Sequence, residues 1–344
     1  MLSVLHVLPH PGGGAETYVD LLEAMPDVGH ERRTLSPSRR LAGTAVALPR
    51  RYPSLLRAAR RADVVHVHGD AAAILGLPLL ALGPAVLTTH GLHLLRRVQG
   101  VALGAVRAGL VAAVRAAAVT VCCSEAERDE LRAILPARLH RRLAVVHNGI
   151  PLPGRDPEQR RAARADLGLA GADVAGLFLG ELEPRKDPLT AVRAAQRAAA
   201  AGAPFVLLVA GSGPLEAELR AAAGPAVRVL GFRDDPHALL AAADLFTMPS
   251  LREGLSFAVL EAMGRGLAMV VSDGAGNPEA VGDAGIVLPA GDEAAFAAAF
   301  EALSGDAARR AELGRRARDR VRRNFTDTQL REGVRAAYAR AQGA

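Results

Sequence analysis

Residues 176–188, GLFLGELEPRKDP, contain the pattern that decides the fold. A short, uninterrupted apolar run ends at a glycine, a charged loop follows, and a proline then opens an alanine-rich stretch. The same order recurs at residues 205–216, FVLLVAGSGPLE, where glycines again separate an apolar run from a helical one. Continuous apolar strands that alternate with helices are typical of a parallel sheet covered on both faces.

This alternation continues along the whole chain. The apolar runs predict strands at residues 3–9, 64–68, 85–89, 119–123, 143–147, 176–180, 205–210, 227–230, 245–248, 268–271 and 286–288. A Gly/Pro-rich segment, NGIPLPG at residues 148–154, separates two copies of the pattern. We therefore expect an α/β protein with two doubly wound domains and a cleft between them, and ligands outside the carboxyl ends of the strands.

Length and composition exclude several classes of protein. The 344 residues are enough for two domains, each with its own core. Of the 42 lysine and arginine residues only Lys186 is a lysine, so the net charge of +6 reflects a compositional bias more than a polyanion site. Two adjacent cysteines, Cys122 and Cys123, cannot crosslink a secreted scaffold and favour a reducing, cytoplasmic setting. The opening MLSVLHVLPHP lacks a basic segment before its apolar run and is predicted to be a strand, not a signal peptide.

Three loops that follow predicted strands carry glycines or cations suited to an anionic ligand. In the first loop, Gly12–Gly14 let the backbone approach a ligand at a helix N-terminus, although Thr17 breaks the dinucleotide fingerprint G-x-G-x-x-G. In the loop at 180–188, Arg185 and Lys186 could hold a diphosphate. A third loop carries Gly211 and Gly213, where tight turning alone is an alternative explanation.

The most informative stretch is PSLREGLSFAVLEAMGRG, residues 249–266. A loop carries Glu253 and Gly254, and a helix is predicted to begin at about Ser256. Free backbone N–H groups at residues 255–257 would suit a phosphate. Glu261 lies further along the same helix, so the two carboxylates would reach different parts of one ligand.

Two other chemistries are weaker interpretations of the same residues. The run GLSFA at 254–258 imitates the nucleophile elbow of an α/β-hydrolase, but no histidine follows Ser256, the last being His237. His66 and His68 share one face of a strand, yet no nearby carboxylate or cysteine completes a metal site, so we predict none. No Asp-x-Asp occurs that could clamp a divalent metal on a nucleotide diphosphate. His90 ends a strand of the first half and is expected to face the cleft.

Taken together, these motifs resemble the retaining GT-B glycosyltransferases of family four, glycosyl transferases group 1. The shared features are the Gly-rich first loop, the segment from Gly180 to Lys186, AGSGP at 210–214, the run at 249–266 and GAGNPE at 274–279. The resemblance covers nearly the whole chain. It implies two facing Rossmann-like domains: residues 1–149 for the acceptor and 150–324 for the nucleotide-sugar donor. It also implies a C-terminal helix, at about 325–344, that packs back on the first domain.

The resemblance also implies roles for individual residues. Lys186 would bind the donor diphosphate, Glu253 would contact the transferred sugar near its reacting carbon, and Glu261 would accept the ribose hydroxyls. His90 would lie near the sugar. The remaining donor-binding residues implied are Gly13 and Gly14 over the diphosphate, Gly211, Gly213 and Gly254 in the loops, Leu255, Ser256 and Phe257 through their amides, and Phe232 with Arg233 beside the base.

The chain departs from the family pattern in one loop. Glu181 stands where the family usually has arginine, and Arg185 replaces a commonly acidic residue. Arg185 could supply the lost cation; weaker diphosphate binding or a different donor preference are the alternatives.

The function implied is metal-independent, retaining transfer of a hexose-type sugar from a nucleotide-diphosphate sugar to a hydroxyl acceptor, with no cofactor. UDP is the first candidate nucleotide because it is the commonest, and the acceptor is a small molecule, a glycan or a lipid. Alternatives within the fold are a nucleotide-sugar epimerase and a sugar phosphorylase. A nucleic-acid binder is disfavoured because no aromatic-rich basic patch occurs. Peripheral contact with the inner face of a membrane stays open, since an apolar stretch carries spaced arginines, Arg96, Arg97, Arg107 and Arg115.

Overall fold

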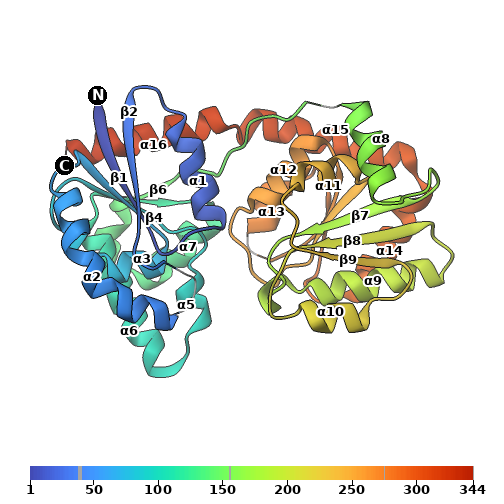
Figure 1. Ribbon diagram of the computed structural model, residues 1–344, viewed down its shortest axis with the longest axis horizontal. Helices are drawn as coiled ribbons and strands as arrows, with labels where there is room; N and C mark the ends of the chain where they lie inside the picture. Colours follow the sequence, from blue (N-terminus) through green and yellow to red (C-terminus); the bar gives the residue numbers. More distant parts are fainter. Residues whose placement is uncertain (38–40, 155, 275, 344) are drawn as a thin grey trace. The chain divides into compact units, whose positions relative to one another are not determined.

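The computed structural model describes residues 1–344 apart from 38–40, 155, 275 and 344. The chain divides into two compact units, one formed by Met1–Asn148 with Asp327–Ala344 and the other by Gly149–Thr326 (Figure 1). Each unit contains a six-stranded sheet in which all neighbouring strands are parallel. Every strand expected from the apolar runs is present, with ends within two residues of the prediction.

In the first unit the strand order is β2-β1-β3-β4-β5-β6. Its elements are β1 (Leu2–Leu8), α1 (Gly14–Glu23), β2 (Val28–Thr34), α2 (Leu41–Ala59), β3 (Val64–His68), α3 (Asp70–Leu75), α4 (Leu77–Leu80), β4 (Ala85–Thr88), α5 (His93–Arg97), α6 (Gly100–Ala116), β5 (Val119–Cys122), α7 (Glu125–Ile134), η1 (Ala137–Arg142), β6 (Leu143–Val145) and α16 (Asp327–Gln342).

In the second unit the order is β12-β11-β10-β7-β8-β9. Its elements are α8 (Pro157–Asp166), β7 (Val174–Leu179), η2 (Pro184–Lys186), α9 (Pro188–Ala200), β8 (Phe205–Ala210), α10 (Glu216–Ala222), β9 (Val227–Gly231), α11 (Pro236–Ala242), β10 (Leu245–Met248), α12 (Phe257–Arg265), β11 (Ala268–Ser272), α13 (Gly276–Val281), β12 (Ile286–Leu288), α14 (Glu293–Gly305) and α15 (Ala307–Asn324).

Both faces of the central strands are covered, as the apolar runs predict. All residues of β3, β4, β5, β10 and β11 are buried. Because successive side chains of a strand point to opposite faces, full burial of consecutive residues requires layers on both sides.

Several helices begin where a polar side chain accepts a hydrogen bond from their first turn. Ser124 accepts from the amide of Glu127 (3.1 Å) at the start of α7, and Asp156 accepts from that of Glu158 (2.8 Å) at the start of α8. Such caps satisfy amides that a helix cannot pair internally, and they fix where each helix leaves its strand.

One strand, β2, is not predicted by the apolar runs, because its sequence VGHERRT is mostly polar. β2 is the edge strand of its sheet and pairs with β1 alone, from Leu2↔Val28 to Leu8↔Thr34. An edge strand is partly exposed, so backbone pairing rather than an apolar run selects its conformation. Such a strand has no continuous apolar run from which it could be predicted.

The C-terminal helix α16 is part of the first unit. The Tyr338 hydroxyl lies 2.9 Å from Nδ1 of His66, and an Nη of Arg335 lies 2.5 Å from Oδ1 of Asp27. Tyr338 is fully buried. The chain therefore returns from the second unit to the first between Thr326 and Asp327.

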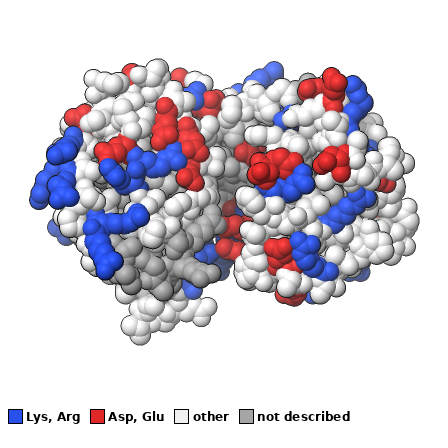
Figure 2. Space-filling view, in the orientation of Figure 1, with Lys and Arg blue, Asp and Glu red and all other residues white. Residues whose placement is uncertain are grey.

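The positive charges do not form one continuous basic surface on the face shown in Figure 2, where basic side chains lie beside acidic ones at several places. Arg32, for example, pairs with Glu16 (3.2 Å), Asp20 (2.5 Å) and Glu23 (2.9 Å). Exposed pairs of this kind contribute little to stability, but they neutralise the local field that a polyanion would need.

Candidate active site

The predicted donor residues lie in loops that follow neighbouring strands of the second sheet. Because β10, β7, β8 and β9 are adjacent and parallel, the loops after them meet at one edge. Main-chain hydrogen bonds tie these loops together: the amide of Leu182 donates to Ser212 O (3.0 Å), and that of Leu251 donates to Arg185 O (2.9 Å). The segments are thus one assembled structure rather than independent loops.

Glycines permit this close packing of backbone on backbone. A Cβ on Gly211 would lie 1.8 Å from the carbonyl oxygen of Gly180, and one on Gly276 would lie 2.1 Å from that of Gly254. Gly213 is similarly close to the backbone of Leu182. The glycine spacing is therefore required by the fold of this edge, whatever the loops bind.

Lys186 and Glu253 form a buried ion pair at this edge. Nζ of Lys186 lies 2.8 Å from Oε2 of Glu253, and only 8% of each side chain is exposed. The same oxygen accepts a hydrogen bond from Oγ of Ser250 (3.2 Å) and lies 3.4 Å from Nη1 of Arg185. Lys186 and Glu253, far apart in sequence, are thus brought together as one polar centre, and Ser250 is a member that the sequence analysis missed.

Arg185 is surrounded by carboxylates. Besides Glu253 it contacts Glu181 (Nη2 to Oε2, 3.3 Å) and Glu183 (Nε to Oε2, 3.1 Å). The two residues at which the chain departs from the family pattern therefore face each other. Two cations and three carboxylates share this centre, so an incoming anion would compete with the carboxylates for Arg185.

Helix α12 begins at Phe257, close to the predicted start, and Ser256 precedes it. The Ser256 hydroxyl accepts no hydrogen bond from the first turn of the helix. The Ser256 side chain therefore does not cap the N-terminus of α12, which is the positive end of the helix dipole.

Glu261 lies one turn further along α12. Burial raises the pKa of its carboxyl group from 4.5 to about 7. Among the described residues, no hydrogen bond or ion pair to this carboxylate is found. Glu261 is only partly exposed, and a partly buried acid without a partner is costly to keep; such groups are more often found at functional sites than elsewhere.

The predicted base-binding residues follow β9. Phe232 is 75% exposed, so its ring is open to solvent. Arg233 forms a bidentate pair with Asp235 (2.7 and 2.6 Å), so its guanidinium is held in place. Phe232 therefore offers an open ring face at the same edge of the sheet as Lys186.

In the first unit, the glycine loop lies between β1 and α1. Gly12 and Gly13 have φ of 83° and 86°, a region that favours glycine, and Gly14 is the first residue of the helix. The amide of Gly12 donates to Oε2 of Glu16 (2.7 Å). The three glycines thus form a tight turn at a helix N-terminus, as expected.

His90 lies in a turn with unusual backbone. His90, Gly91 and Leu92 have successive φ values of 53°, 102° and 51°, which is strained for the two residues that are not glycine. The carboxylate of Glu127 accepts from the amides of Gly91 and Cys123, the latter at 2.6 Å, and holds the turn in place. Glu127 is buried and was not anticipated from the sequence.

Both ring nitrogens of His90 contact other side chains of the first unit. Nε2 lies 3.0 Å from Nδ1 of His68, and Nδ1 lies 3.7 Å from Sγ of Cys123. Burial lowers the pKa of His90 to about 3, so the ring is neutral at pH 7. His90 is therefore part of a histidine network rather than an isolated group.

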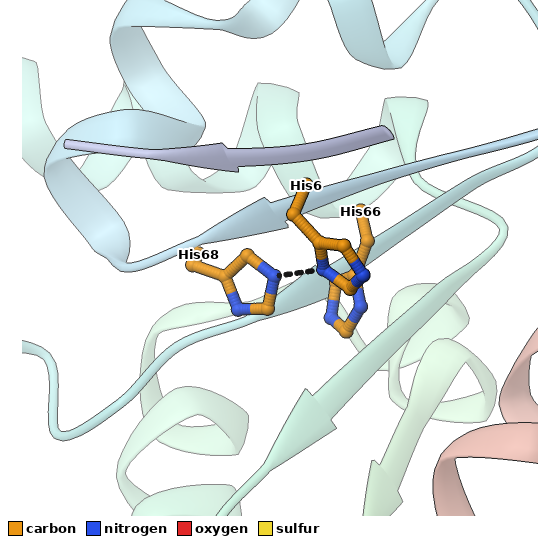
Figure 3. Close-up of side chains that lie close together, drawn as sticks. All are labelled: His6, His66 and His68. Carbon is orange, nitrogen blue, oxygen red and sulfur yellow. Dashed lines mark hydrogen bonds between the residues drawn. The ribbon is translucent and has the colours of Figure 1, made fainter. Parts of the chain in front are cut away.

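The centre of that network is a group of three buried histidines, His6, His66 and His68, drawn in Figure 3. Nδ1 of His6 lies 3.0 Å from Nε2 of His68. Burial lowers the pKa of His6 to about 3 and those of His66 and His68 well below their ordinary value. The expectation that His66 and His68 share a face is confirmed by their ring centroids, 4.0 Å apart. His6 was not predicted from the sequence, because only the strand register places it beside His66 and His68.

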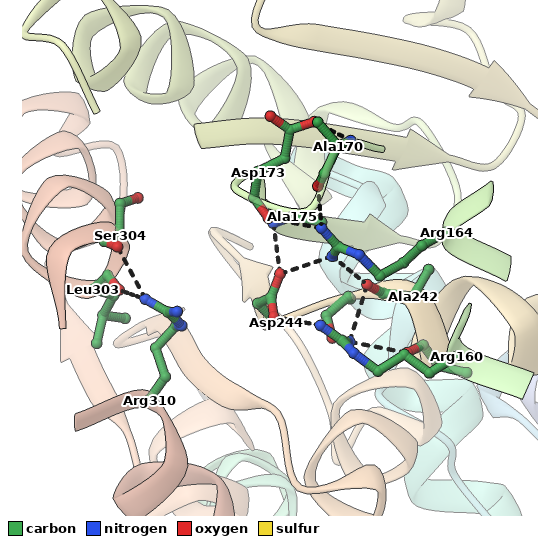
Figure 4. Close-up of polar contacts among 12 residues, drawn as sticks. Arg160, Arg164, Ala170, Asp173, Ala175, Ala242, Asp244, Leu303, Ser304 and Arg310 are labelled. Atoms are coloured by element: carbon green, nitrogen blue, oxygen red, sulfur yellow. Dashed lines mark hydrogen bonds and ion pairs between the residues drawn. The ribbon is translucent and has the colours of Figure 1, made fainter. Parts of the chain in front are cut away.

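At the amino-terminal ends of the strands of the second sheet, arginines form several polar contacts (Figure 4). Asp244 pairs with Arg160 (2.6 Å) and Arg164 (3.1 Å), and Arg160 also donates to the carbonyl oxygens at the end of α11. A cavity of about 530 Å³ adjoins this region, with Arg265 and Arg310 among its lining residues. Since β10 begins at Leu245, next to Asp244, this cavity lies away from the predicted donor loops.

No helix of the described residues is long and apolar enough to cross a bilayer. Of the four arginines considered for membrane contact, Arg96 pairs with Glu130 (2.5 Å) and only 11% of its side chain is exposed. Arg96 is therefore not available for contact with a membrane. Cys122 and Cys123 are buried free thiols.

Comparison with known proteins gives consistent results for both halves of the chain. Residues 9–152 match the family described as Glycosyltransferase Family 4, and residues 174–306 match Glycosyl transferases group 1. The α-maltose-1-phosphate synthase of Mycolicibacterium smegmatis is 30% identical over 329 residues, which cover 88% of this chain and 85% of that protein.

One further relative and one solved structure are also similar to this chain. The D-inositol 3-phosphate glycosyltransferase of Nocardia farcinica is 33% identical over 216 residues, 58% of this chain, and the match spans about half of that protein (48%). The crystal structure of HepE from Anabaena in complex with UDP and glucose superimposes with a TM-score of 0.83 at 19% identity, covering 98% of this chain and 100% of that one.

The two parallel sheets and their loops define a glycosyltransferase of the GT-B fold. The chain belongs to the group 1 glycosyltransferases, and the resemblance of its motifs to GT-B enzymes of that group is confirmed.

Proposed function

We propose that this glycosyltransferase moves a hexose-type sugar from a nucleotide-diphosphate sugar, with UDP as first candidate, to a hydroxyl acceptor with retention of anomeric configuration and without a divalent metal. The observation that carries the proposal is the buried pair of Lys186 and Glu253, which joins the loops after β7 and β10. HepE, which has the same fold, was crystallised with UDP and glucose, and that supports the choice of nucleotide.

The chemistry requires a cation where the leaving group gains charge. As the bond between the anomeric carbon and the diphosphate breaks, Lys186, Arg185 and the first amides of α12 would stabilise the departing phosphate. Arg185 would exchange its carboxylate partners for phosphate oxygens. Because the chain's own groups supply this charge, no metal clamp is needed.

Glu253 would lie beside the sugar as positive charge develops on its ring. Its carboxylate is shared among Lys186, Arg185 and Ser250, so it is fixed in position rather than poised to attack. We assign no covalent nucleophile. The leaving phosphate would take the proton of the acceptor hydroxyl on the same face of the sugar, which retains the configuration.

The remaining donor contacts follow the loop positions. Phe232 would stack on the base beside Arg233, and Glu261 would accept from the ribose hydroxyls. From the first unit, we propose that Gly13 and Gly14 contact the diphosphate and that His90 lies near the sugar. The acceptor would bind to the first unit.

The decisive experiment is a nucleotide-release assay with UDP-, GDP- and dTDP-sugars. Lys186→Ala and Glu253→Gln should each lower turnover about 10²–10³-fold, the typical effect of removing one group that stabilises transition-state charge. Glu301→Gln, an exposed substitution on α14, is the matched control and should match the parent. EDTA present during the assay should leave the rate unchanged, and NMR of the product should show the donor's anomeric configuration.

Other outcomes separate the alternatives. Conversion of the nucleotide sugar without nucleotide release would indicate an epimerase, and a requirement for inorganic phosphate without any nucleotide would indicate a phosphorylase. If no nucleotide sugar binds, and both site variants behave like the parent, the transfer reaction proposed is wrong.

Peripheral membrane contact is a separate part of the proposal and points to a lipid acceptor. It rests on α6, where Val101 is 94% exposed and Arg107 lies on the same exposed stretch. Flotation with anionic vesicles should retain the protein. Absence from the vesicle fraction would leave a small-molecule or glycan acceptor.

A further inference from the structure

We propose that His6, His66 and His68 bind a divalent transition-metal ion of the Zn²⁺ class inside the first unit. All three side chains are fully buried, and one potential ligand atom of each lies within 4.8 Å of the others. The site touches one proposed donor-site residue, His90, through His68, but it does not depend on the proposed reaction.

The strand register assembles the three rings. His6 in β1 is the Cα partner of His66 in the neighbouring β3, and His68 follows two residues later. Because side chains two residues apart in a strand share a face, all three imidazoles lie on one side of the sheet, as Figure 3 shows.

One distance between potential ligand atoms is close to that in a zinc site, and the other pairs lie within 4.8 Å. Nδ1 of His6 and Nε2 of His68 are 3.0 Å apart and point toward each other. Zn–N bonds of about 2.0–2.1 Å in a tetrahedral site place neighbouring ligand atoms about 3.3 Å apart. Shifts of a few tenths of an ångström would therefore open the pair around an ion.

The outward nitrogens of His6 and His68 already have partners. Nε2 of His6 lies 2.9 Å from Nδ1 of His30, and Nδ1 of His68 lies 3.0 Å from Nε2 of His90. Metal-binding histidines almost always engage the second ring nitrogen in this way, which fixes the tautomer and the ring orientation.

His66 meets the same requirement whichever nitrogen it turns to the ion. Nδ1 lies 2.9 Å from the hydroxyl of Tyr338 in α16, and Nε2 lies 2.7 Å from Oγ1 of Thr88 in β4. One contact would be given up and the other would orient the ring. The ion would join β1 to β3, and with Nε2 of His66 on the ion the retained contact with Tyr338 would also tie the site to the C-terminal helix.

The donor set selects the kind of metal. Three neutral imidazoles without a carboxylate suit zinc, cobalt, nickel or copper ions, whereas magnesium and calcium need oxygen ligands. Because the rings are buried, the ion would enter while the unit folds, and binding would stabilise the folded state. We infer a structural role.

The test is to refold the full chain from denaturant, with EDTA or with Zn²⁺, and to measure bound zinc by mass spectrometry after gel filtration. The parent should retain about one equivalent per chain and unfold at a higher temperature than its EDTA-refolded form. His6→Gln and His68→Gln preserve hydrogen-bonding groups but remove a ligand, and each should weaken zinc binding at least about 100-fold. His237→Gln, which removes an exposed histidine of the second unit, is the control and should behave like the parent.

Two results would overturn the proposal: a parent that retains no zinc after refolding with it, or ligand variants that retain as much as the parent. If a ligand variant fails to fold, refolding the parent with Co²⁺ decides the question. Tetrahedral nitrogen ligation should give strong visible d–d absorption at one equivalent, and the weak spectrum of hydrated Co²⁺ alone would mean that the histidines only hydrogen-bond to one another.

Discussion

Glu261 allows a test of whether a carboxylate that destabilises the fold when charged is used to bind the nucleotide-sugar donor. The carboxyl group has a pKa of about 7 in the folded chain, against an ordinary value of 4.5, because burial disfavours its charged form. Glu261→Gln keeps the shape of the side chain and removes the titration. The variant should therefore separate two effects of the charged carboxylate: its effect on the free energy of unfolding and its effect on nucleotide affinity.

The sign and the size follow from the pKa shift. Below pH 4.5 the group is protonated in both states and contributes no penalty. Between pH 4.5 and about 7 the unfolded chain loses this proton while the folded chain keeps it, so stability falls over this range and levels off above the folded pKa. A shift from 4.5 to about 7 corresponds to at most about 3 kcal/mol. Glu261→Gln should therefore match the parent near pH 4.5 and exceed its unfolding free energy by about 2–3 kcal/mol at about pH 8.

Donor binding should show the opposite preference. A hydrogen bond from a ribose hydroxyl to a carboxylate contributes about 1.5–3 kcal/mol, against about 0.5–1.5 kcal/mol for one to a neutral amide, and Glu261 could accept from two hydroxyls. The parent's affinity for the nucleotide should therefore rise as the pH increases through 7, with release of a proton on binding. The affinity of Glu261→Gln should be about 10- to 100-fold weaker at high pH and nearly independent of pH.

Urea unfolding at several pH values and calorimetric titration of the nucleotide in buffers of different ionisation enthalpy measure both effects. Glu301→Gln, an exposed acid-to-amide change, should show neither. If the free energy of unfolding of Glu261→Gln equals that of the parent at every pH, the charge on Glu261 does not destabilise the folded chain. If the affinity falls equally at all pH values, Glu261 does not meet the ribose as a carboxylate.

Two further predictions concern the backbone of the loops. Glu127→Gln leaves only one acceptor for the amides of Gly91 and Cys123 and should lower the unfolding free energy by about 1.5–3 kcal/mol in urea; an unchanged midpoint would show that the carboxylate does not hold the turn. Gly211→Ala places a Cβ within 1.8 Å of a carbonyl oxygen and should cost at least about 3 kcal/mol, with loss of nucleotide binding, whereas Gly171→Ala, in open space, should be tolerated. Equal stability of the two alanine variants would contradict the packing argument.

The sequence was a good guide to the elements that rely on local signals. Buried strands such as β3 and β8 are recognisable because a parallel sheet covered on both faces needs a continuous apolar run. β2 was missed because an edge strand carries no such run, and its conformation comes from pairing with β1. Local patterning therefore predicts interior strands better than edge strands.

The candidate site was predictable in its residues but not in its pairings. The lone lysine, Lys186, and the run that carries Glu253 were both selected from the sequence, and the structure joins them at 2.8 Å. The sequence left open whether Arg185 supplies the cation lost at Glu181, and it gave no sign that Arg185 lies against Glu181 and Glu183. Charged side chains on one loop can point in several directions, and only the assembled neighbours decide among them.

By itself, the sequence determined the α/β class, the division of the chain near residue 150, the family, and the loops that carry the candidate chemistry. These properties depend on periodicity, glycine positions and short motifs, which are local. Only the tertiary structure decided that Glu253 lies against Lys186, that Glu127 holds the turn of His90, and that His6 joins His66 and His68. The physical reason is that such contacts depend on strand order and register, which are set by packing over the whole unit.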